Sequence, residues 1–298
     1  MRWKRITKTH LPHPQCEINK ITNKVMMTTN NLPIGVFDSG MGGLTVLRAL
    51  KNALPHEAFI YLGDTARLPY GTKSPDTVQQ YASQMARVLV ERNIKALVIA
   101  CNTATTAALP HLQALLPAIP VLGVVIPGAK AVVAATNNQQ IIVLATETTI
   151  ASQAYQQLIT SQLPKAVIRA KACSLLVALA EEGMTDNIVA REALRHYLTD
   201  IQNEDTLLLG CTHFPVFKSL LKTFLPDTIT IVDSAEATAL ALMEELQKSN
   251  LHATSPQTDV QYLVTDSVAR FQKVGEIFLG EELAHHKIEL IDAGGLKV

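Results

Sequence analysis

Residues 97–106 read LVIACNTATT. The apolar first half is typical of a buried strand, and the small polar residues that follow are typical of the start of a helix. A strand that leads into a helix is the repeating unit of a parallel sheet covered by helices. Cys101 stands at the junction, where a cysteine is either a packed core residue or a reactive thiol.

The same strand-to-helix pattern recurs along the chain from Pro33 onward. Short apolar runs alternate with amphipathic stretches such as residues 75–92, 187–200 and 234–248. This alternation predicts an α/β protein with mostly parallel sheets covered on both faces. The predicted strands are residues 34–37, 59–62, 96–100, 121–125, 141–144, 166–170, 206–209, 228–232, 262–264 and 287–290.

Two pairs of segments resemble each other within the chain. LVIACNTATT resembles LLLGCTHFPV (207–216), and VFDSGMGGLT (36–45) resembles IVDSAEATAL (231–240). The pairs predict two pseudo-symmetric α/β domains that face each other across a cleft, with the active site in that cleft. We expect a first domain of residues 32–125 plus 236–298 and a second domain of residues 126–235.

Composition excludes several classes of protein. The 298 residues carry a formal net charge of +0, which argues against a partner such as nucleic acid that overall charge would attract. Apolar runs fall short of the ~18 residues that a membrane helix needs, so no membrane contact is expected. The 4 cysteines show no CxxC and no zinc-site spacing, which favours free thiols in a reducing cytoplasm and argues against a metal site.

Residues 1–31 differ from the rest. Up to Lys24, six basic residues stand against the single acid Glu17, and no apolar signal segment is present. We interpret this stretch as a flexible basic extension, or as sequence upstream of a start at Met26 or Met27. A regulatory or partner-binding arm is the alternative.

Chemically capable side chains fall at the ends of the predicted strands. Ligands of open α/β sheets bind beyond the carboxyl ends of the strands. A helix that follows such a strand offers unpaired N–H groups, which lower the pKa of a thiol and attract a carboxylate. The side chains at these positions are Asp38, Ser39, Cys101, Asn102, Cys211, Thr212 and His213.

Two cysteines in matched settings favour one type of reaction. Inversion of a carbon stereocentre needs a base on one face and an acid on the other, and reversal exchanges the two roles. A thiol pair meets this symmetry, and its ordinary pKa of about 8.5 lies within reach of neutral pH. A cysteine hydrolase built on Cys211 and His213 is an alternative that leaves Cys101 unused. Core packing is expected for Cys173, and no role for Cys16.

Four longer segments resemble the signatures of the glutamate racemases, cofactor-independent enzymes that supply D-glutamate for bacterial peptidoglycan. The resemblance runs from about residue 32 to the C-terminus and implies racemisation of glutamate by two thiols, with no cofactor and no metal. The segments are IGVFDSGMGGLTVLRAL (34–50), YLGDTARLPYGTKS (61–74), VIACNTATTAAL (98–109) and LLLGCTHFP (207–215).

The resemblance implies catalytic roles for five residues. Cys101 and Cys211 correspond to the two catalytic thiols, the first acting on D-glutamate and the second on L-glutamate. Asp38 resembles the acid that assists Cys101, and His213 the imidazole that assists Cys211. Glu181 resembles the carboxylate behind that imidazole, with Glu182 as the adjacent alternative.

Substrate contacts are implied in the same way. ATETTI (145–150) stands where the family has a segment similar to GTxGTI, so Ala145 and Thr148 replace two glycines. The implied contacts are Asp38, Ser39, Tyr70, Gly71, Asn102, Thr103, Thr146, Thr149, Thr212 and His213.

Partners follow from the resemblance as well. Glutamate is the expected substrate, and a homodimer is expected because dimers are frequent in this family. Some members inhibit gyrase, and some with N-terminal extensions respond to a peptidoglycan precursor, so both partners stay open for the basic extension. An aspartate racemase and a binding protein with idle thiols are the remaining alternatives.

Overall fold

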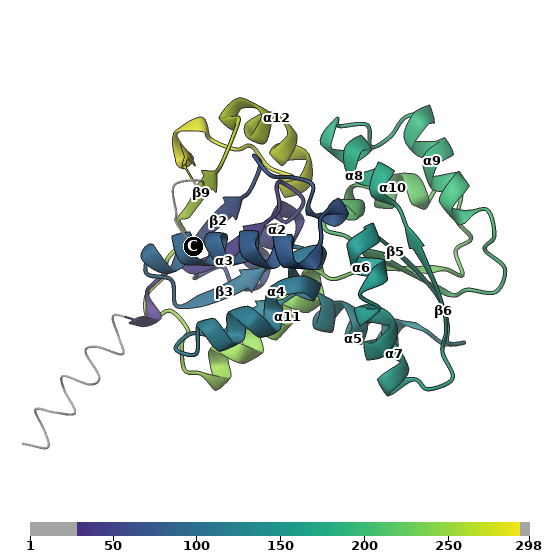
Figure 1. Ribbon diagram of the computed structural model, residues 1–298, viewed down its shortest axis with the longest axis horizontal. Helices are drawn as coiled ribbons and strands as arrows, with labels where there is room; N and C mark the ends of the chain where they lie inside the picture. The colour runs from purple at the N-terminus through teal and green to yellow at the C-terminus, as the bar shows by residue number, and fades with distance from the viewer. Residues whose placement is uncertain (1–28, 293–298) are drawn as a thin grey trace, which may run out of the picture.

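The computed structural model describes residues 29–292 and contains two α/β domains that lie side by side (Figure 1). This confirms the predicted fold class. Residues 1–28, which include Cys16 and most of the predicted extension, and residues 293–298 lie outside the described residues.

The first domain is built on a parallel sheet in the order β10-β9-β2-β1-β3-β4. Its strands come from both ends of the described chain. The second domain is therefore inserted between β4 and helix α11 (Ala235–Lys248), where the chain returns to the first domain. The strands are β1 (Ile34–Asp38), β2 (Phe59–Gly63), β3 (Ala96–Ile99), β4 (Val121–Gly123), β9 (Val260–Val264) and β10 (Ile288–Leu290).

The second domain is built on a smaller parallel sheet in the order β6-β5-β7-β8. Its strands are β5 (Gln140–Ala145), β6 (Val167–Ala172), β7 (Thr206–Gly210) and β8 (Thr230–Asp233). Each of the ten predicted strands is present within a few residues of its expected place. The predicted end of the fourth strand, at Val125, was wrong, because Val124 and Val125 begin a helix. Both side chains are buried at this helix start, so their apolar character does not mark a strand.

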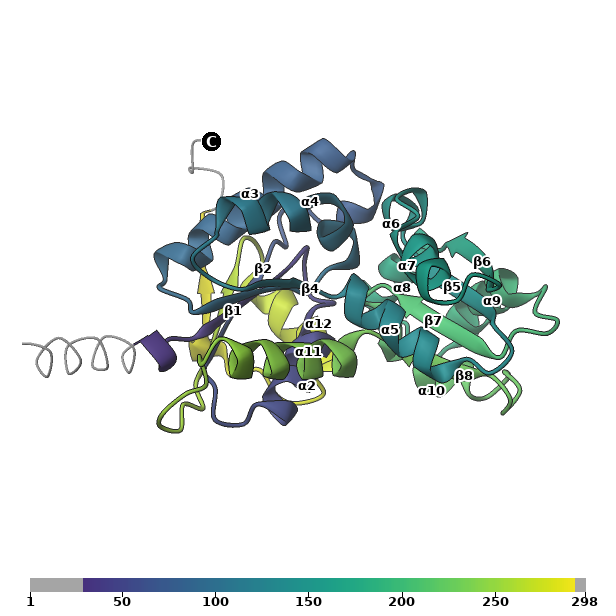
Figure 2. The same ribbon diagram turned by 90° about the horizontal axis from the view of Figure 1, so that it is seen from below.

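Helices cover both faces of each sheet. In the first domain α3 and α4 lie on one face and α2, α11 and α12 on the other (Figure 2). In the second domain α5 and α7 lie on one face, opposite α8, α9 and α10 (Figure 1). The helices are α2 (Leu44–Ala53), α3 (Pro75–Glu91), α4 (Asn102–Leu115), α5 (Val125–Ala135), α6 (Glu147–Ala151), α7 (Ala154–Gln162), α8 (Ser174–Glu181), α9 (Ile188–Leu198), α10 (Lys218–Leu221), α11 (Ala235–Lys248) and α12 (Val268–Leu279), with short 3₁₀ segments η1 (Tyr70–Thr72), η2 (Phe214–Phe217) and η3 (His285–Lys287). No helix in this described part is long and apolar enough to cross a membrane.

The chain passes between the domains twice. The first crossing runs from β4 into α5, and the second runs from β8 into α11. Helix α11 packs on α2 of the first domain and also touches α5. We therefore propose domain boundaries at the two crossings, as the sequence predicts, near residues 125 and 235.

Strand register brings the predicted site residues to two facing edges. In the first sheet Phe37 pairs with Ile99, so Asp38 and Cys101 follow neighbouring strands at the same carboxyl edge. In the second sheet Ala145 pairs with Gly210, so Thr146 and Cys211 do the same.

A buried ion pair closes the opposite end of the first sheet. Lys95 directly precedes β3, and its Nζ lies 2.5 Å from Oε2 of Glu57. The side chain of Lys95 is 1% exposed and that of Glu57 is 3% exposed. The same ammonium donates to the carbonyl oxygens of Asn30 (2.5 Å) and Leu251 (2.8 Å). Burial lowers the pKa of Lys95, and Glu57 counteracts this. The pair ties the first described residues to the loop before β9.

Replacement of one partner of the Lys95–Glu57 ion pair should lower the free energy of unfolding more than replacement of both partners. Lys95→Met leaves the Glu57 carboxylate buried without its cation, so we expect a loss of about 3–5 kcal/mol in the free energy of unfolding. Urea denaturation of Lys95→Met and of Lys95→Met/Glu57→Gln measures this. The account fails here if the single variant is as stable as the double variant.

Candidate active site

Cys101 occupies the predicted position between a strand and a helix. It caps the N-terminus of α4, and its Sγ accepts a hydrogen bond from the Ala104 N–H at 3.4 Å. The Sγ also donates to Oγ of Ser39 at 3.5 Å. Burial, followed by the neighbouring Asp38 charge, raises the pKa of Cys101 to about 12, although the Ala104 N–H acts in the opposite direction. The helix end thus acts on this pKa in the expected direction, but burial outweighs one N–H donor, so the expected thiolate is not favoured at Cys101.

Cys211 has a different setting from Cys101. It follows β7, but the chain then forms the short η2 and α10 instead of one long helix. Its partner is a side chain: Sγ lies 3.8 Å from Nδ1 of His213. The predicted helix N-terminus is thus replaced here by an imidazole.

His213 links the Cys211 thiol to a buried carboxylate. Its Nε2 lies 2.8 Å from Oε1 of Glu181, and both side chains are 5% exposed. Burial acts to lower the pKa of His213, but hydrogen bonds and charges from Cys211 and Glu181 raise it well above its ordinary value. The protonated imidazolium is therefore favoured between the two groups.

The geometry distinguishes Glu181 from Glu182. Glu181 ends α8 and points at the imidazole, whereas Glu182 is 61% exposed and forms an ion pair with Arg270 at 3.0 Å. The Arg270 guanidinium also donates to the Glu181 carbonyl oxygen at 3.1 Å. Of these two glutamates, Glu181 is the one that contacts His213.

Gly42 supplies the space that the His213 ring occupies. A Cβ at this position would overlap the imidazole. The glycine-rich DSGMGG segment (38–43) therefore serves close packing between the two domains.

Asp38 lies at the centre of the contact between the domains. Its carboxylate accepts hydrogen bonds from the Gly40 N–H (2.9 Å) and from the Thr212 hydroxyl across the cleft (3.4 Å). Burial raises the pKa of Asp38, against the lowering effect of the His213 charge and of backbone N–H donors. Thr45, which the sequence analysis missed, donates to the Thr212 carbonyl oxygen at 3.1 Å.

Three threonine hydroxyls meet across the cleft. Thr103 lies 2.8 Å from Thr146 and 3.3 Å from Thr149, and the last two are 3.0 Å apart (Oγ1 to Oγ1 throughout). Thr148, at a position where the family pattern has glycine, donates to the carbonyl oxygens of Gly71 and Lys73 at 3.0 Å each. The altered ATETTI segment thus gains a hydrogen-bonded bridge to the opposite domain.

Tyr70 is held by a residue that the sequence analysis did not single out. The Tyr70 hydroxyl donates to the buried carboxylate of Asp64, which also accepts from Nε of Arg67 (2.7 Å) and from the Thr265 hydroxyl (2.9 Å). Asp64 lies within the segment YLGDTARLPYGTKS, but its contact with Thr265 on a distant strand end is not visible in the local pattern.

Most of the predicted residues line one enclosed cavity of about 20 Å³, which leaves room for about one water molecule. Asp38 and Thr149 lie directly behind the lining. Leu68, Pro69 and Val177 also line it and were not predicted. The predicted residues in the lining are Ser39, Tyr70, Gly71, Cys101, Asn102, Thr103, Thr146, Glu181, Cys211, Thr212 and His213.

The arrangement can move protons at an enclosed ligand. Two thiols from different domains line one cavity, and each has its own titratable neighbour. Cys173, in contrast, is fully buried at the start of α8 and does not line the cavity, in keeping with its predicted packing role. The cavity is too small for an amino acid, so its lining must move apart to admit one.

Comparisons with known proteins agree with this chemistry. The family model described as Asp/Glu/Hydantoin racemase matches residues 34–242. A glutamate racemase of Geobacter metallireducens is 48% identical over 253 residues, which cover 84% of this chain and 93% of that protein.

Solved structures show the same likeness. The glutamate racemase of Francisella tularensis, crystallised with D-glutamate, has a TM-score of 0.81 at 36% identity and covers 90% of this chain and 100% of its own. The Escherichia coli glutamate racemase, in complex with L-glutamate and the activator UDP-MurNAc-ala, has a TM-score of 0.71 at 29% identity, covering 83% of this chain and 95% of its own. The two thiols, their neighbours and these likenesses together mean that the chain belongs to the Asp/Glu/Hydantoin racemase family and, within it, to the glutamate racemases.

Proposed function

We propose that Cys101 and Cys211 carry out the racemisation of glutamate by this chain, one as base and the other as acid. The observation that carries the proposal is that both thiols line the same enclosed cavity but come from different domains. A ligand held between them therefore has one thiol on each side of its α-carbon.

The protonation states of Cys101 and His213 favour Cys101 as the acid and Cys211 as the base in the reaction of L-glutamate. Cys101, whose pKa burial raises to about 12, holds a proton to give. His213 as an imidazolium places a positive charge 3.8 Å from the sulfur of Cys211, which suits Cys211 to the role of base. The Cys211 thiolate takes the α-proton, so that a C–H bond breaks as an S–H bond forms.

The opposite thiol completes the inversion. Cys101 delivers its proton to the other face of the α-carbon, and its sulfur is left as a thiolate. The enzyme is then ready for D-glutamate with the two roles exchanged. The enclosed cavity excludes bulk water from the carbanion-like transition state, and fixed N–H and O–H dipoles stabilise its charge.

Substrate charges have matching partners around the cavity. Asp38 offers a carboxylate to the substrate ammonium group, and a cation there would offset the burial that raises the pKa of Asp38. Hydroxyls of Thr103, Thr146 and Thr149 can donate to a carboxylate. The D-glutamate bound by the Francisella tularensis relative supports glutamate over aspartate.

Hydrogen exchange at the substrate tests the activity directly. The purified chain in D₂O, without added cofactor, should convert L-glutamate and D-glutamate into each other and replace the α-proton by deuterium, with much slower reaction of aspartate. NMR and polarimetry measure exchange and inversion together. Faster reaction of aspartate would overturn the substrate, and no exchange of either amino acid would overturn the activity.

Single thiol variants should lose inversion. We expect Cys101→Ser and Cys211→Ser each to lower racemisation by about 100- to 10,000-fold, the range of a general acid or base. Cys173→Ala is the matched control at a buried cysteine outside the cavity and should keep nearly full turnover. A Cys101 or Cys211 variant as active as this control contradicts the two-thiol mechanism.

The wider role follows the family. We propose that the D-glutamate supplies peptidoglycan synthesis in the cytoplasm, where the free thiols of Cys101, Cys173 and Cys211 would stay reduced. A homodimer and a gyrase partner stay predictions of the resemblance.

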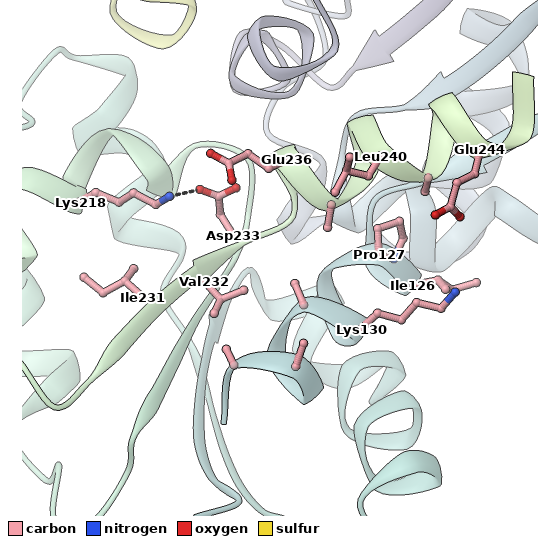
Figure 3. Close-up of a pocket in the computed structure, with 15 residues that line it drawn as sticks. Ile126, Pro127, Lys130, Lys218, Ile231, Val232, Asp233, Glu236, Leu240 and Glu244 are labelled. Carbon is pink, nitrogen blue, oxygen red and sulfur yellow. Dashed lines mark ion pairs between the residues drawn. The ribbon is translucent and has the colours of Figure 1, made fainter. Parts of the chain in front are cut away.

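A nucleotide-sugar activator has a candidate site at the domain crossings. A cavity of about 660 Å³ lies between α5 and α11, the two helices that begin where the chain passes between domains (Figure 3). Lys130 and Lys218 line it, and Lys218 is paired with Asp233. The volume suits a cofactor-sized ligand. The Lys130 ammonium suits a diphosphate, whereas the carboxylates of Glu236 and Glu244, which also line the cavity, suit hydroxyl or N–H donors of the ligand. An occupant that contacts both helices would bias opening of the domains.

The Escherichia coli relative's activator, UDP-MurNAc-ala, is the probe for this site. We expect it to raise the rate of racemisation of the wild-type chain, and Lys130→Ala to weaken that response at least about fivefold, because a charged hydrogen-bond partner is lost. Lys165→Ala, an exposed lysine in the loop before β6, is the control. No response of the wild-type chain, or an equal response of both variants, contradicts the assignment.

A further inference from the structure

Tyr155 connects the second domain to a residue of the active-site cavity. It lies in the first turn of α7 and is 1% exposed. Its hydroxyl donates to Oδ1 of Asn102, the first residue of α4 in the other domain, over 2.5 Å. Neither the motifs nor the predicted strand ends pointed to Tyr155.

The other end of the Asn102 side chain has no protein partner. Nδ2 is buried and makes no hydrogen bond within residues 29–292, and Asn102 lines the cavity between the two thiols. A carboxamide whose oxygen is engaged presents only N–H donors. Such a buried donor is costly to leave unpaired, so it is poised for an acceptor that arrives with the ligand.

We propose that Tyr155 is a positioning residue, which fixes the Asn102 carboxamide so that Nδ2 faces a carboxylate oxygen of the substrate. The inference rests on the proposed function and adds a residue to it. Without the phenol, the carboxamide can turn over and present its oxygen to the carboxylate. Two acceptors would then face each other, and substrate would bind less well.

Tyr155 is itself held from two sides. Ser234, at the second domain crossing, lies beside the phenol and acts to lower the pKa of Tyr155. Gly128, in the helix that follows the first crossing, leaves no space: a Cβ there would lie 2.9 Å from the Tyr155 hydroxyl oxygen and 3.1 Å from Cβ of Ser234. Helices α5 and α7 run side by side in both views (Figures 1 and 2). The position of the Tyr155 hydroxyl is therefore restricted by its packing against these neighbours.

The phenol can act as a donor at any working pH. Burial, together with the nearby Cys211 and Asp233 charges, raises the pKa of Tyr155 far above its ordinary value, so the hydroxyl keeps its proton. The contribution of Tyr155 should therefore not titrate, in contrast to that of the thiols and His213.

A double-mutant cycle tests the inference. Tyr155→Phe should lower kcat/KM for glutamate about 5- to 150-fold, the range expected when a buried hydrogen-bonding group loses its partner, mainly through KM. In an Asn102→Ala background the same change should have less than about a twofold effect, because Tyr155 acts through the missing carboxamide. Tyr262→Phe, a buried tyrosine on β9, is the control and should leave kcat/KM unchanged.

A second variant reaches the same phenol without altering it. Gly128→Ala displaces the Tyr155 hydroxyl and should also lower kcat/KM in the wild-type background but not in the Asn102→Ala background. Equal losses in both backgrounds would mean a merely structural role and overturn the inference. Wild-type activity on glutamate with an unaffected Tyr155→Phe variant would overturn this inference alone, whereas an inactive wild-type chain would overturn the proposed function.

Discussion

The structure depends on one contact: the carboxyl edges of two parallel sheets meet face to face. A parallel sheet gathers the side chains that follow its strands at one edge, so two such edges place residues distant in sequence around a common space. The hydrogen bonds that join the edges include those from Thr45 to Thr212, from Thr212 to Asp38 and from Tyr155 to Asn102. Each of these three has at least one partner that lines the cavity.

Closure sets the electrostatics of the site. Asp38, Glu181 and His213 are all nearly excluded from solvent, which is costly for charged groups unless they neutralise one another. The imidazolium between Cys211 and Glu181 provides the positive charge, while burial keeps Cys101 protonated. In the proposed mechanism a symmetric reaction is carried out by two thiols in unequal settings, and a proton must return from Cys211 to Cys101 only between successive turnovers in the same direction.

Local sequence patterns predicted the strands and most of the site, because both depend on which residues end each strand. Cys101 and Cys211 were found in this way. The family resemblance added Tyr70, Gly71, Thr103, Thr146, Thr149 and Glu181. Asp64, Tyr155 and the Thr148 bridge were missed, since their partners lie on other elements and, for the last two, in the other domain.

The electrostatic setting of the thiols was also beyond a local pattern. A strand followed by polar residues suggested a helix that begins directly after Cys211, where the chain forms only the short η2 and α10. The depth of burial around Cys101 depends on the whole fold, and it reversed the expected direction of the pKa change.

The central claim is that a single glutamate lies between two thiols on opposite faces of its α-carbon. A crystal structure of the wild-type chain with bound D-glutamate tests this most directly. The account predicts that the α-carbon lies about 3–4 Å from Sγ of both Cys101 and Cys211, on opposite sides. A glutamate bound within reach of only one thiol, or with both thiols on the same face, would contradict it.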